Sequence, residues 1–349
     1  MVATSNGIAP ATAPGAAAQA TYSYRDLLDL ELPPALPLVE GLLDEETGNI
    51  WGGPPNVGKT WLILTLGRAI ASGTPWLGHF ATAQGSVLII DEESHLRGLV
   101  NRAQMLDAGD HLGDDLPLFF AVGHGIRIEP GAGFARLNEL MTRHQPKLVV
   151  ADSLTRVHGA NENDAGQMSD VFHNVKLLMR AHGASFLFTD HVRKRGIIND
   201  PDEMLRGTTE KRAWPDSILA VEPQEQDRSA LTVTHTKSRH SQRLAPFGVQ
   251  MEIDELGRTA RLAYAGAVSR TQATKANDII LAIHALQEQL GPDGADATTV
   301  AAWIDASEET VRRHVGKLVK AGIVRTRKAT PSEKGGRPKN VYDVAGGEE

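Results

Sequence analysis

Short apolar runs alternate with longer amphipathic segments between residues 22 and 264. Several runs are rich in β-branched residues and show no polar alternation, which is typical of strands buried on both faces of a mainly parallel sheet. The predicted strands cover residues 86–91, 116–122, 147–152, 185–190, 217–223 and 230–235. An apolar stripe with helical spacing predicts a helix packed on this sheet. The stripe consists of Met168, Val171, Phe172, Val175, Leu178 and Met179. The alternation predicts an α/β domain with a doubly wound, mainly parallel sheet.

The pattern changes after residue 264. Residues 265–275 are small or polar without periodicity, and predict a linker. Helical patterns and strand-like runs then follow, with Ser307 as the expected N-cap of the last helix. The expected helices lie within 278–290, 298–305 and 307–324, and the expected strands within 323–329 and 340–344. Three helices followed by a two-stranded wing predict a winged helix-turn-helix domain over residues 276–346.

The composition excludes several classes of protein. The 349 residues are 41% hydrophobic, as in ordinary globular proteins, and the length suggests about two domains. The net charge of −7 disfavours a chain that binds nucleic acid over its whole surface. The absence of cysteine excludes a disulfide scaffold and cysteine-ligated zinc. No apolar run approaches the roughly 20 residues of a membrane span, and the alanine-rich residues 1–21 lack the features of a signal peptide. We expect a disordered tail on a soluble, cytoplasmic protein.

Residues 53–60 read GPPNVGKT and fit the P-loop pattern G-x-x-x-x-G-K-T. In such a loop, backbone N–H groups and the start of the following helix bind phosphate. Lys59 reaches the β- and γ-phosphates of ATP, and the Thr60 hydroxyl binds Mg²⁺. Because Pro54 and Pro55 have no N–H group, residues 56–60 supply most of the backbone N–H groups that bind the phosphates. The predicted nucleotide-binding residues are Gly53, Asn56, Val57, Gly58, Lys59, Thr60 and Trp61.

Acidic residues end two of the predicted strands. Asp152 follows the buried run of residues 147–151 and is the expected second magnesium ligand, with Thr60 as the first. Asp91, Glu92 and Glu93 follow the run that starts at residue 86, and offer a base or a water-positioning group for hydrolysis.

With these motifs in place, the chain resembles the RecA-type ATPases, and among them the plasmid RepA-like and DnaB-like hexameric helicases. Residues 206–217, RGTTEKRAWPDS, also resemble a stretch of the RepA-like ATPases. The resemblance implies a RecA-like sheet that hydrolyses ATP. It also implies Glu93 as the catalytic base, with Glu92 as the alternative. It covers roughly residues 40–260.

The same resemblance gives His191 and two loops a role. A histidine at this strand end contacts the γ-phosphate in such helicases and passes the nucleotide state to the next loop. Residues 155–166 and 192–217 correspond to loops that bind single-stranded DNA through its phosphates, with an affinity that falls as salt rises. The basic residues of the second loop are Arg193, Lys194, Arg195, Arg206, Lys211 and Arg212. A solvated lid over the nucleotide is the alternative interpretation.

Lys237 and Arg239 form a K-x-R pair near the end of a late strand. In hexameric RecA-type helicases such a pair crosses the subunit boundary and enters the neighbour's active site as an arginine finger. The resemblance therefore implies that the catalytic residues are Lys59, Glu93, His191, Lys237 and Arg239. Scattered basic residues on a surface hairpin are the alternative.

The predicted winged helix is locally basic. Residues 306–340 contain ten lysines and arginines against three glutamates. This balance favours duplex DNA as the partner, with a recognition helix in the major groove and wing residues on phosphates. The expected contacts come from Arg312, Arg313, Lys317, Arg325, Arg327, Lys328 and Arg337. A protein-binding module is the alternative.

Three functions fit these expectations. The first is a RepA-like replicative helicase, an oligomeric ring with a hexamer favoured, that moves on single-stranded DNA. The second is a recombination or helicase-loading ATPase that does not unwind DNA. The third is an ATP-gated, DNA-binding regulator.

Overall fold

The computed structural model describes residues 21–30, 37–191, 208–224, 229–254, 256–268, 271–304, 306–320, 323–330 and 339–344. For residues 271–278, 281 and 317 it describes the backbone only. The described residues form two compact units, one ending at Ala267 and the other beginning at Val268. No helix in the described part of the chain is long and apolar enough to span a membrane.

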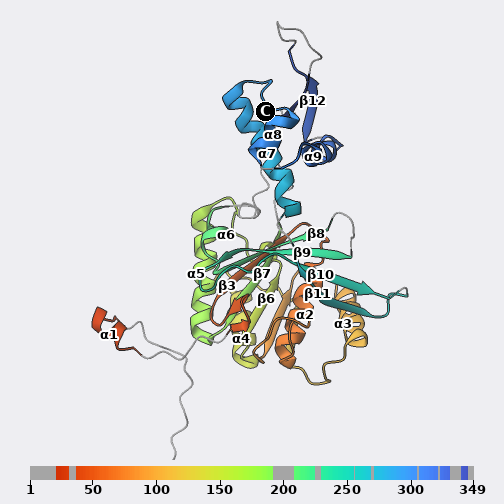
Figure 1. Cartoon of the computed structure of the whole chain (residues 1–349). Coiled ribbons are helices and arrows are strands. Elements are labelled where there is room, and N and C mark those ends of the chain that lie inside the picture. Colours follow the sequence, from red (N-terminus) through yellow and green to blue (C-terminus); the bar gives the residue numbers. More distant parts are fainter. Residues whose placement is uncertain are drawn as a thin grey trace, which may run out of the picture. The chain divides into compact units, whose positions relative to one another are not determined.

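The first unit alternates strands and helices (Figure 1). Its helices are α1 (Tyr24–Leu28), α2 (Lys59–Ser72), α3 (Leu96–Gly109), α4 (Ala132–His144), α5 (Ala165–His182) and α6 (Glu210–Ala213), with a 3₁₀ turn at Leu154–Arg156. Its strands are β1 (Pro37–Val39), β2 (Leu43–Asp44), β3 (Gly48–Gly53), β4 (Val87–Asp91), β5 (Leu118–Val122), β6 (Leu148–Asp152), β7 (Ser185–His191), β8 (Ser217–Pro223), β9 (Ala230–Ser238), β10 (Phe247–Ile253) and β11 (Ala260–Ala267).

Within the described residues, strands β3 to β11 form one sheet in the order β11-β10-β9-β8-β3-β7-β6-β4-β5. The pairings from β8 through β3 to β5 are parallel, whereas β8-β9, β9-β10 and β10-β11 are antiparallel. The carboxyl ends of parallel strands meet at one edge of a sheet, where ligands bind in open α/β folds. The large, mostly parallel sheet fits a P-loop, RecA-like fold.

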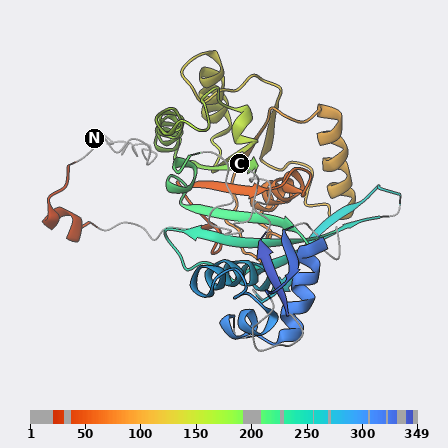
Figure 2. The ribbon, with the colours of Figure 1, turned by 90° about the horizontal axis from the view of Figure 1, so that it is seen from above.

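Helices cover both faces of this sheet (Figures 1 and 2). On one face, α2 and α3 bury Leu62, Leu66 and Leu99 against strand residues such as Ile89. On the other face, α4 and α5 pack against residues of opposite parity, including Ile90. Strands buried on both faces explain the apolar runs without polar alternation.

The strand predictions are confirmed to within a few residues, and so is the helix under the apolar stripe, which is α5. Strand β9 continues to Ser238, so Lys237 lies within the strand rather than beyond it. The sequence analysis did not predict β10 and β11, because the small and charged residues of β11 give a weak apolar signal.

The second unit contains α7 (Thr271–Leu290), α8 (Ala297–Trp303), α9 (Glu308–Lys320), β12 (Val324–Lys328) and β13 (Asn340–Val344). The helices share an apolar core with Val324 and Tyr342, and β12 pairs antiparallel with β13. Ser307 caps α9, because its hydroxyl accepts a hydrogen bond from the N–H of Thr310 at 3.2 Å. Helix α7 begins at Thr271, inside the segment expected to be a linker, since its first turns carry no large apolar residue that reveals helical spacing.

Candidate active site

Four strand ends meet beside the P-loop. Gly53 at the end of β3 pairs with His191 of β7, and Asp152 of β6 pairs with Asp91 of β4. The register of the sheet thus places the P-loop, the predicted metal ligand, the acidic segment and the histidine along one edge.

The P-loop has a backbone that few residues can adopt. Asn56 and Gly58 have φ angles of 61° and 105°, in the left-handed region. A Cβ on Gly53 would lie 2.7 Å from the backbone oxygen of Val221, so only glycine fits there without a shift. Val57 is buried, and half-buried Trp61 packs against the same core, with Arg102 5.9 Å from its ring centre. The residues of the loop therefore suit the backbone conformation and the close packing that the structure shows there.

Lys59 is buried and lies across the loop. Its ammonium donates hydrogen bonds to the carbonyl oxygens of Gly53 and Pro54, at 2.8 and 3.0 Å. Burial lowers the pKa of Lys59, while the carboxylates of Asp152, Asp190 and Glu93 oppose that change. These two carbonyls are acceptors that phosphate oxygens can replace, which fits a lysine that binds the terminal phosphates.

Thr60 and Asp152 are in direct contact. The Thr60 hydroxyl donates to one carboxylate oxygen of Asp152 at 2.8 Å, and the Thr189 hydroxyl donates to the other. Burial raises the pKa of the Asp152 carboxyl, and both hydroxyls oppose the rise. A hydroxyl beside one carboxylate suits Mg²⁺, which binds proteins through one or two carboxylates plus substrate phosphates. The described residues hold no cluster of three or more histidines and acids that could hold a metal ion by itself.

The two candidate bases differ in what they contact. Glu93 accepts a hydrogen bond from the Ser153 hydroxyl at 3.0 Å, directly after Asp152. Glu92 instead accepts from the backbone N–H of Ile126 at 2.8 Å, on the side away from the P-loop. Asp91 holds the turn, because it accepts from the N–H of Glu93 at 3.0 Å. The geometry therefore favours Glu93 as the base and gives Glu92 a structural contact.

His191 is the last residue of β7, next to Gly53 in the sheet. Its Nδ1 is buried and has no hydrogen-bond partner among the described residues. Its backbone N–H donates to Asp190 at 2.8 Å. An unpaired ring nitrogen at the P-loop edge is available to a phosphate oxygen.

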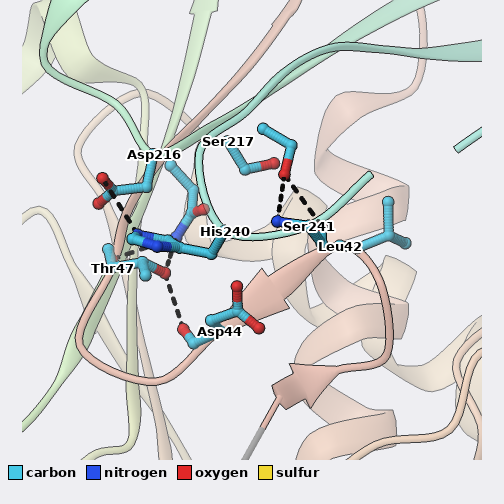
Figure 3. A pocket seen from close by; sticks show the side chains of 9 residues that line it. Leu42, Asp44, Thr47, Asp216, Ser217, His240 and Ser241 are labelled. Atoms are coloured by element: carbon cyan, nitrogen blue, oxygen red, sulfur yellow. Dashed lines mark hydrogen bonds and ion pairs between the residues drawn. The ribbon is translucent and has the colours of Figure 1, made fainter. Parts of the chain in front are cut away.

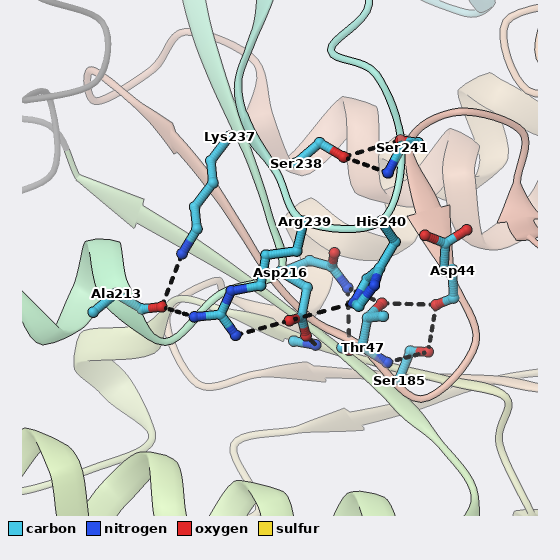
Figure 4. A network of polar contacts seen from close by, with 12 residues as sticks. Asp44, Thr47, Ser185, Ala213, Asp216, Lys237, Ser238, Arg239, His240 and Ser241 are labelled. Carbon is cyan, nitrogen blue, oxygen red and sulfur yellow. Dashed lines mark hydrogen bonds and ion pairs between the residues drawn. The ribbon is translucent and has the colours of Figure 1, made fainter. Parts of the chain in front are cut away.

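Lys237 and Arg239 lie near the amino ends of the parallel strands, at the edge opposite the P-loop. Figure 4 shows the polar contacts of this pair. Ser238 pairs with Ser217, and Ser217 pairs with Asn49 near the start of β3, whereas the P-loop follows the end of β3. The length of β3 thus separates this pair from the nucleotide site of its own chain.

The pair is held there by backbone and carboxylate oxygens. Lys237 donates to the carbonyl oxygens of Arg212 and Ala213 at 2.7 and 2.8 Å. Arg239 donates to the Ala213 carbonyl and pairs with Asp216 at 3.1 Å. Burial, and next the charge of Arg239, lower the pKa of Lys237 from 10.5 to about 8. The pair is therefore partly desolvated and bound to exchangeable partners.

A small polar pocket adjoins the pair (Figure 3). Its walls include Asp44, Thr47, Asp216 and His240. It lies at the amino ends of the parallel strands, so it is distinct from the predicted nucleotide site.

The predicted DNA contacts of the second unit differ in exposure and in their partners. Arg312 is paired with Glu308 of the same helix at 2.9 Å but stays exposed. Arg312, Arg313, Arg325 and Lys328 are exposed. Arg327 is instead fixed by ion pairs to Asp293 and Asp343 at 2.5 and 2.8 Å. These two carboxylates already occupy the guanidinium of Arg327, so this geometry disfavours the predicted contact of Arg327 with DNA. Residues outside the described part are Arg193, Lys194, Arg195, Arg206 and Arg337, together with the side chain of Lys317.

Lys211 also departs from expectation. The sequence analysis placed it in a DNA-binding loop, but it is fully buried and pairs with Asp190 at 2.8 Å. The analysis also gave no role to Ser153 or Thr189. Ser153 directly follows the predicted metal ligand Asp152, and Thr189 lies two residues before His191. A hydroxyl residue at the end of a strand does not by itself indicate a functional site in a sequence.

The AAA domain family matches residues 16–196, just over half of the chain. The match contains the P-loop, Glu93, Asp152 and His191, and ends before Lys237, Arg239 and the second unit. No curated protein matches the chain. The family supports ATP binding and nucleotide hydrolysis, typically with Mg²⁺, in agreement with the edge described above. The chain therefore belongs to the AAA domain family of P-loop ATPases, within the RecA-like superfamily.

Proposed function

We propose that this ATPase is an oligomeric, DNA-stimulated motor of the RepA-like replicative helicase type, with ATP bound between adjacent copies. The observation that carries the proposal is the position of Lys237 and Arg239. They lie at the sheet edge opposite their own P-loop, which supports a role at a nucleotide held by another copy. A hexameric ring, as the family resemblance favours, would repeat this arrangement at each boundary.

In the proposed reaction, N–H groups of residues 56–60 and the Lys59 ammonium hold the β- and γ-phosphates. Thr60 and Asp152 would hold Mg²⁺, which when bound neutralises charge on those phosphates. Glu93 orients the attacking water and takes its proton, while His191 contacts the γ-phosphate. Arg239 of the adjacent copy, with Lys237, stabilises the charge that spreads over the phosphoryl oxygens in the transition state.

DNA would bind at two places. Residues 155–166, and the loop after His191 that lies outside the described residues, would hold single-stranded DNA inside the ring. The second unit would act as a winged helix on duplex DNA, with α9 in the major groove. Exposed Arg312 and Arg313 on α9, and Arg325 and Lys328 on β12, support that assignment.

Substitution of Arg239 tests the shared site. Arg239→Ala is expected to keep ATP binding and lose most hydrolysis, because fingers of this kind contribute factors on the order of 10³ to 10⁵. Arg258→Ala, which removes an exposed arginine paired with Asp254, is the matched control. Normal hydrolysis by Arg239→Ala contradicts the proposal.

A strand-displacement assay then separates the three functions. ATP-dependent unwinding supports the helicase. Hydrolysis stimulated by single-stranded DNA without unwinding favours the recombination or loading ATPase. ATP-dependent binding to duplex DNA, without stimulation by single strands, favours the regulator.

A further inference from the structure

Helix α6 (Glu210–Ala213) contacts both functional edges of the sheet. Its Lys211 side chain bonds to Asp190, next to His191 at the P-loop edge. The last carbonyl groups of the same helix accept the hydrogen bonds of Lys237 and Arg239 at the opposite edge. One short element thus connects the histidine with the cation pair.

The contacts of Lys211 form the first half of this connection. Its ammonium lies 2.8 Å from Oδ2 of Asp190 and 3.3 Å from Oε2 of Glu162. The other oxygen of Asp190 accepts the N–H of His191 at 2.8 Å. Lys211 is fully buried, and a buried charge resists separation from its partner. The pair therefore offers a connection through which a change at His191, at the end of β7, could reach α6.

The packing of α6 forms the second half. Trp214, directly after the helix, stacks on Phe172 with ring centres 4.4 Å apart. A Cβ on Gly48 would lie 2.3 Å from the Trp214 ring, so the ring sits tightly on β3. Trp214 thus anchors the end of the helix. Lys211, Arg212 and Ala213 are consecutive residues of one helical turn, so we expect a displacement of Lys211 to change the position of the carbonyl groups that hold Lys237 and Arg239.

We propose that Lys211 is a positioning residue. It links the contact of His191 with the nucleotide of its own chain to the position of the Lys237–Arg239 pair, which acts on the nucleotide of the neighbouring copy. The inference rests on the proposed function, in which the pair acts across the subunit boundary. It assigns a chain of contacts by which one nucleotide site influences the next around the assembly.

The first test is Lys211→Met. We expect kcat for ATP to fall about 5- to 150-fold, the usual range of coupling between sites, with KM little changed because the P-loop is intact. Lys147→Met, which removes an exposed lysine paired with Glu45, is the matched control. Thermal unfolding checks the fold. Asp190→Asn/Lys211→Met replaces the single variant if the unpaired carboxylate prevents folding. Parental kcat in a folded variant overturns the proposal.

A mixing experiment shows through which site Lys211 acts. Lys211→Met is mixed with a copy that cannot hydrolyse ATP, Glu93→Gln or Lys59→Ala, but offers an intact cation pair. Activity should be restored with Glu93→Gln, which keeps Lys59 and therefore binds the nucleotide that His191 contacts, because the pocket of Lys211→Met then receives a correctly placed pair. Lys59→Ala should restore less, since loss of a phosphate-binding residue also removes the nucleotide contact on which the position of its own pair depends. Mixing Lys211→Met with Arg239→Ala should restore nothing, since neither copy offers a working pair.

The parallel mixture of Arg239→Ala with the same inactive copy separates the two proposals. If that mixture is active and the Lys211→Met mixture is not, Lys211 acts on its own pocket and the inference is wrong while the proposed function stands. If neither mixture is active, the cation pair does not act between copies and both fall.

Discussion

Burial opposes the charge of two ionisable groups at the P-loop edge, Lys59 and Asp152. It lowers the pKa of Lys59 and raises that of Asp152. The groups compensate one another, because Lys59 faces the carboxylates of Asp152, Asp190 and Glu93. A desolvated set of opposite charges strengthens electrostatic contacts with phosphate and metal.

Glu93 and Glu92 provide a matched pair of substitutions. Glu93→Gln removes the base that faces Ser153, and hydrolysis should fall about 10²- to 10⁴-fold, as for other general bases. Glu92→Gln keeps an oxygen that accepts the N–H of Ile126, so its rate should stay close to that of the parent chain. Single-turnover ATP hydrolysis measures both. A larger loss in Glu92→Gln would reverse the assignment.

Lys237 should lose its proton at a lower pH than an ordinary lysine. Burial and the charge of Arg239 put its pKa at about 8 instead of 10.5, so its ammonium should be lost as pH rises through 8. The unfolded chain keeps this proton up to about pH 10.5, so the folded chain binds fewer protons between pH 8 and 10.5. The free energy of unfolding should therefore increase as pH rises through this range, because the cost of burying the charged ammonium is removed. NMR titration of lysine ¹³Cε signals, with Lys237→Arg for assignment, measures the pKa. A midpoint near 10.5 contradicts the desolvated site.

At the level of elements, the sequence predicted those helices, strands and loops that show apolar periodicity or a local motif. Buried strands such as β4 and β6 were found because both of their faces are apolar, and the P-loop because its chemistry lies within eight consecutive residues. Contacts between residues that lie far apart in the sequence could not be predicted from the sequence. That Lys211 is buried against Asp190, and that Lys237 lies across the sheet from the P-loop, depend on strand order and register.

The two arginine environments of the second unit predict different effects on DNA binding. Arg313 on α9 is exposed, so Arg313→Ala should weaken duplex binding and reduce the slope of log affinity against log salt by about 0.9 for each lost phosphate contact. Arg327 is held by Asp293 and Asp343, so Arg327→Ala should lower the Tm of this unit and leave the slope unchanged. Fluorescence anisotropy at several salt concentrations measures the slope. A reduced slope in Arg327→Ala would restore it as a DNA contact.

In the proposed assembly, each copy would carry two incomplete parts of one catalytic centre. The P-loop edge supplies the phosphate cradle, the metal ligands and the base, and the opposite edge supplies the cations. A shared centre makes hydrolysis depend on contact between copies, and α6 offers a route by which neighbouring sites become coupled.

The most direct measurement is the ATPase rate per subunit over a wide range of protein concentration, with oligomeric state measured in parallel by mass photometry. Nucleotide, magnesium and single-stranded DNA are kept saturating. We predict that the rate per subunit falls on dilution together with the fraction of associated chains. An undiminished rate per subunit, where only single chains remain, would contradict the shared centre.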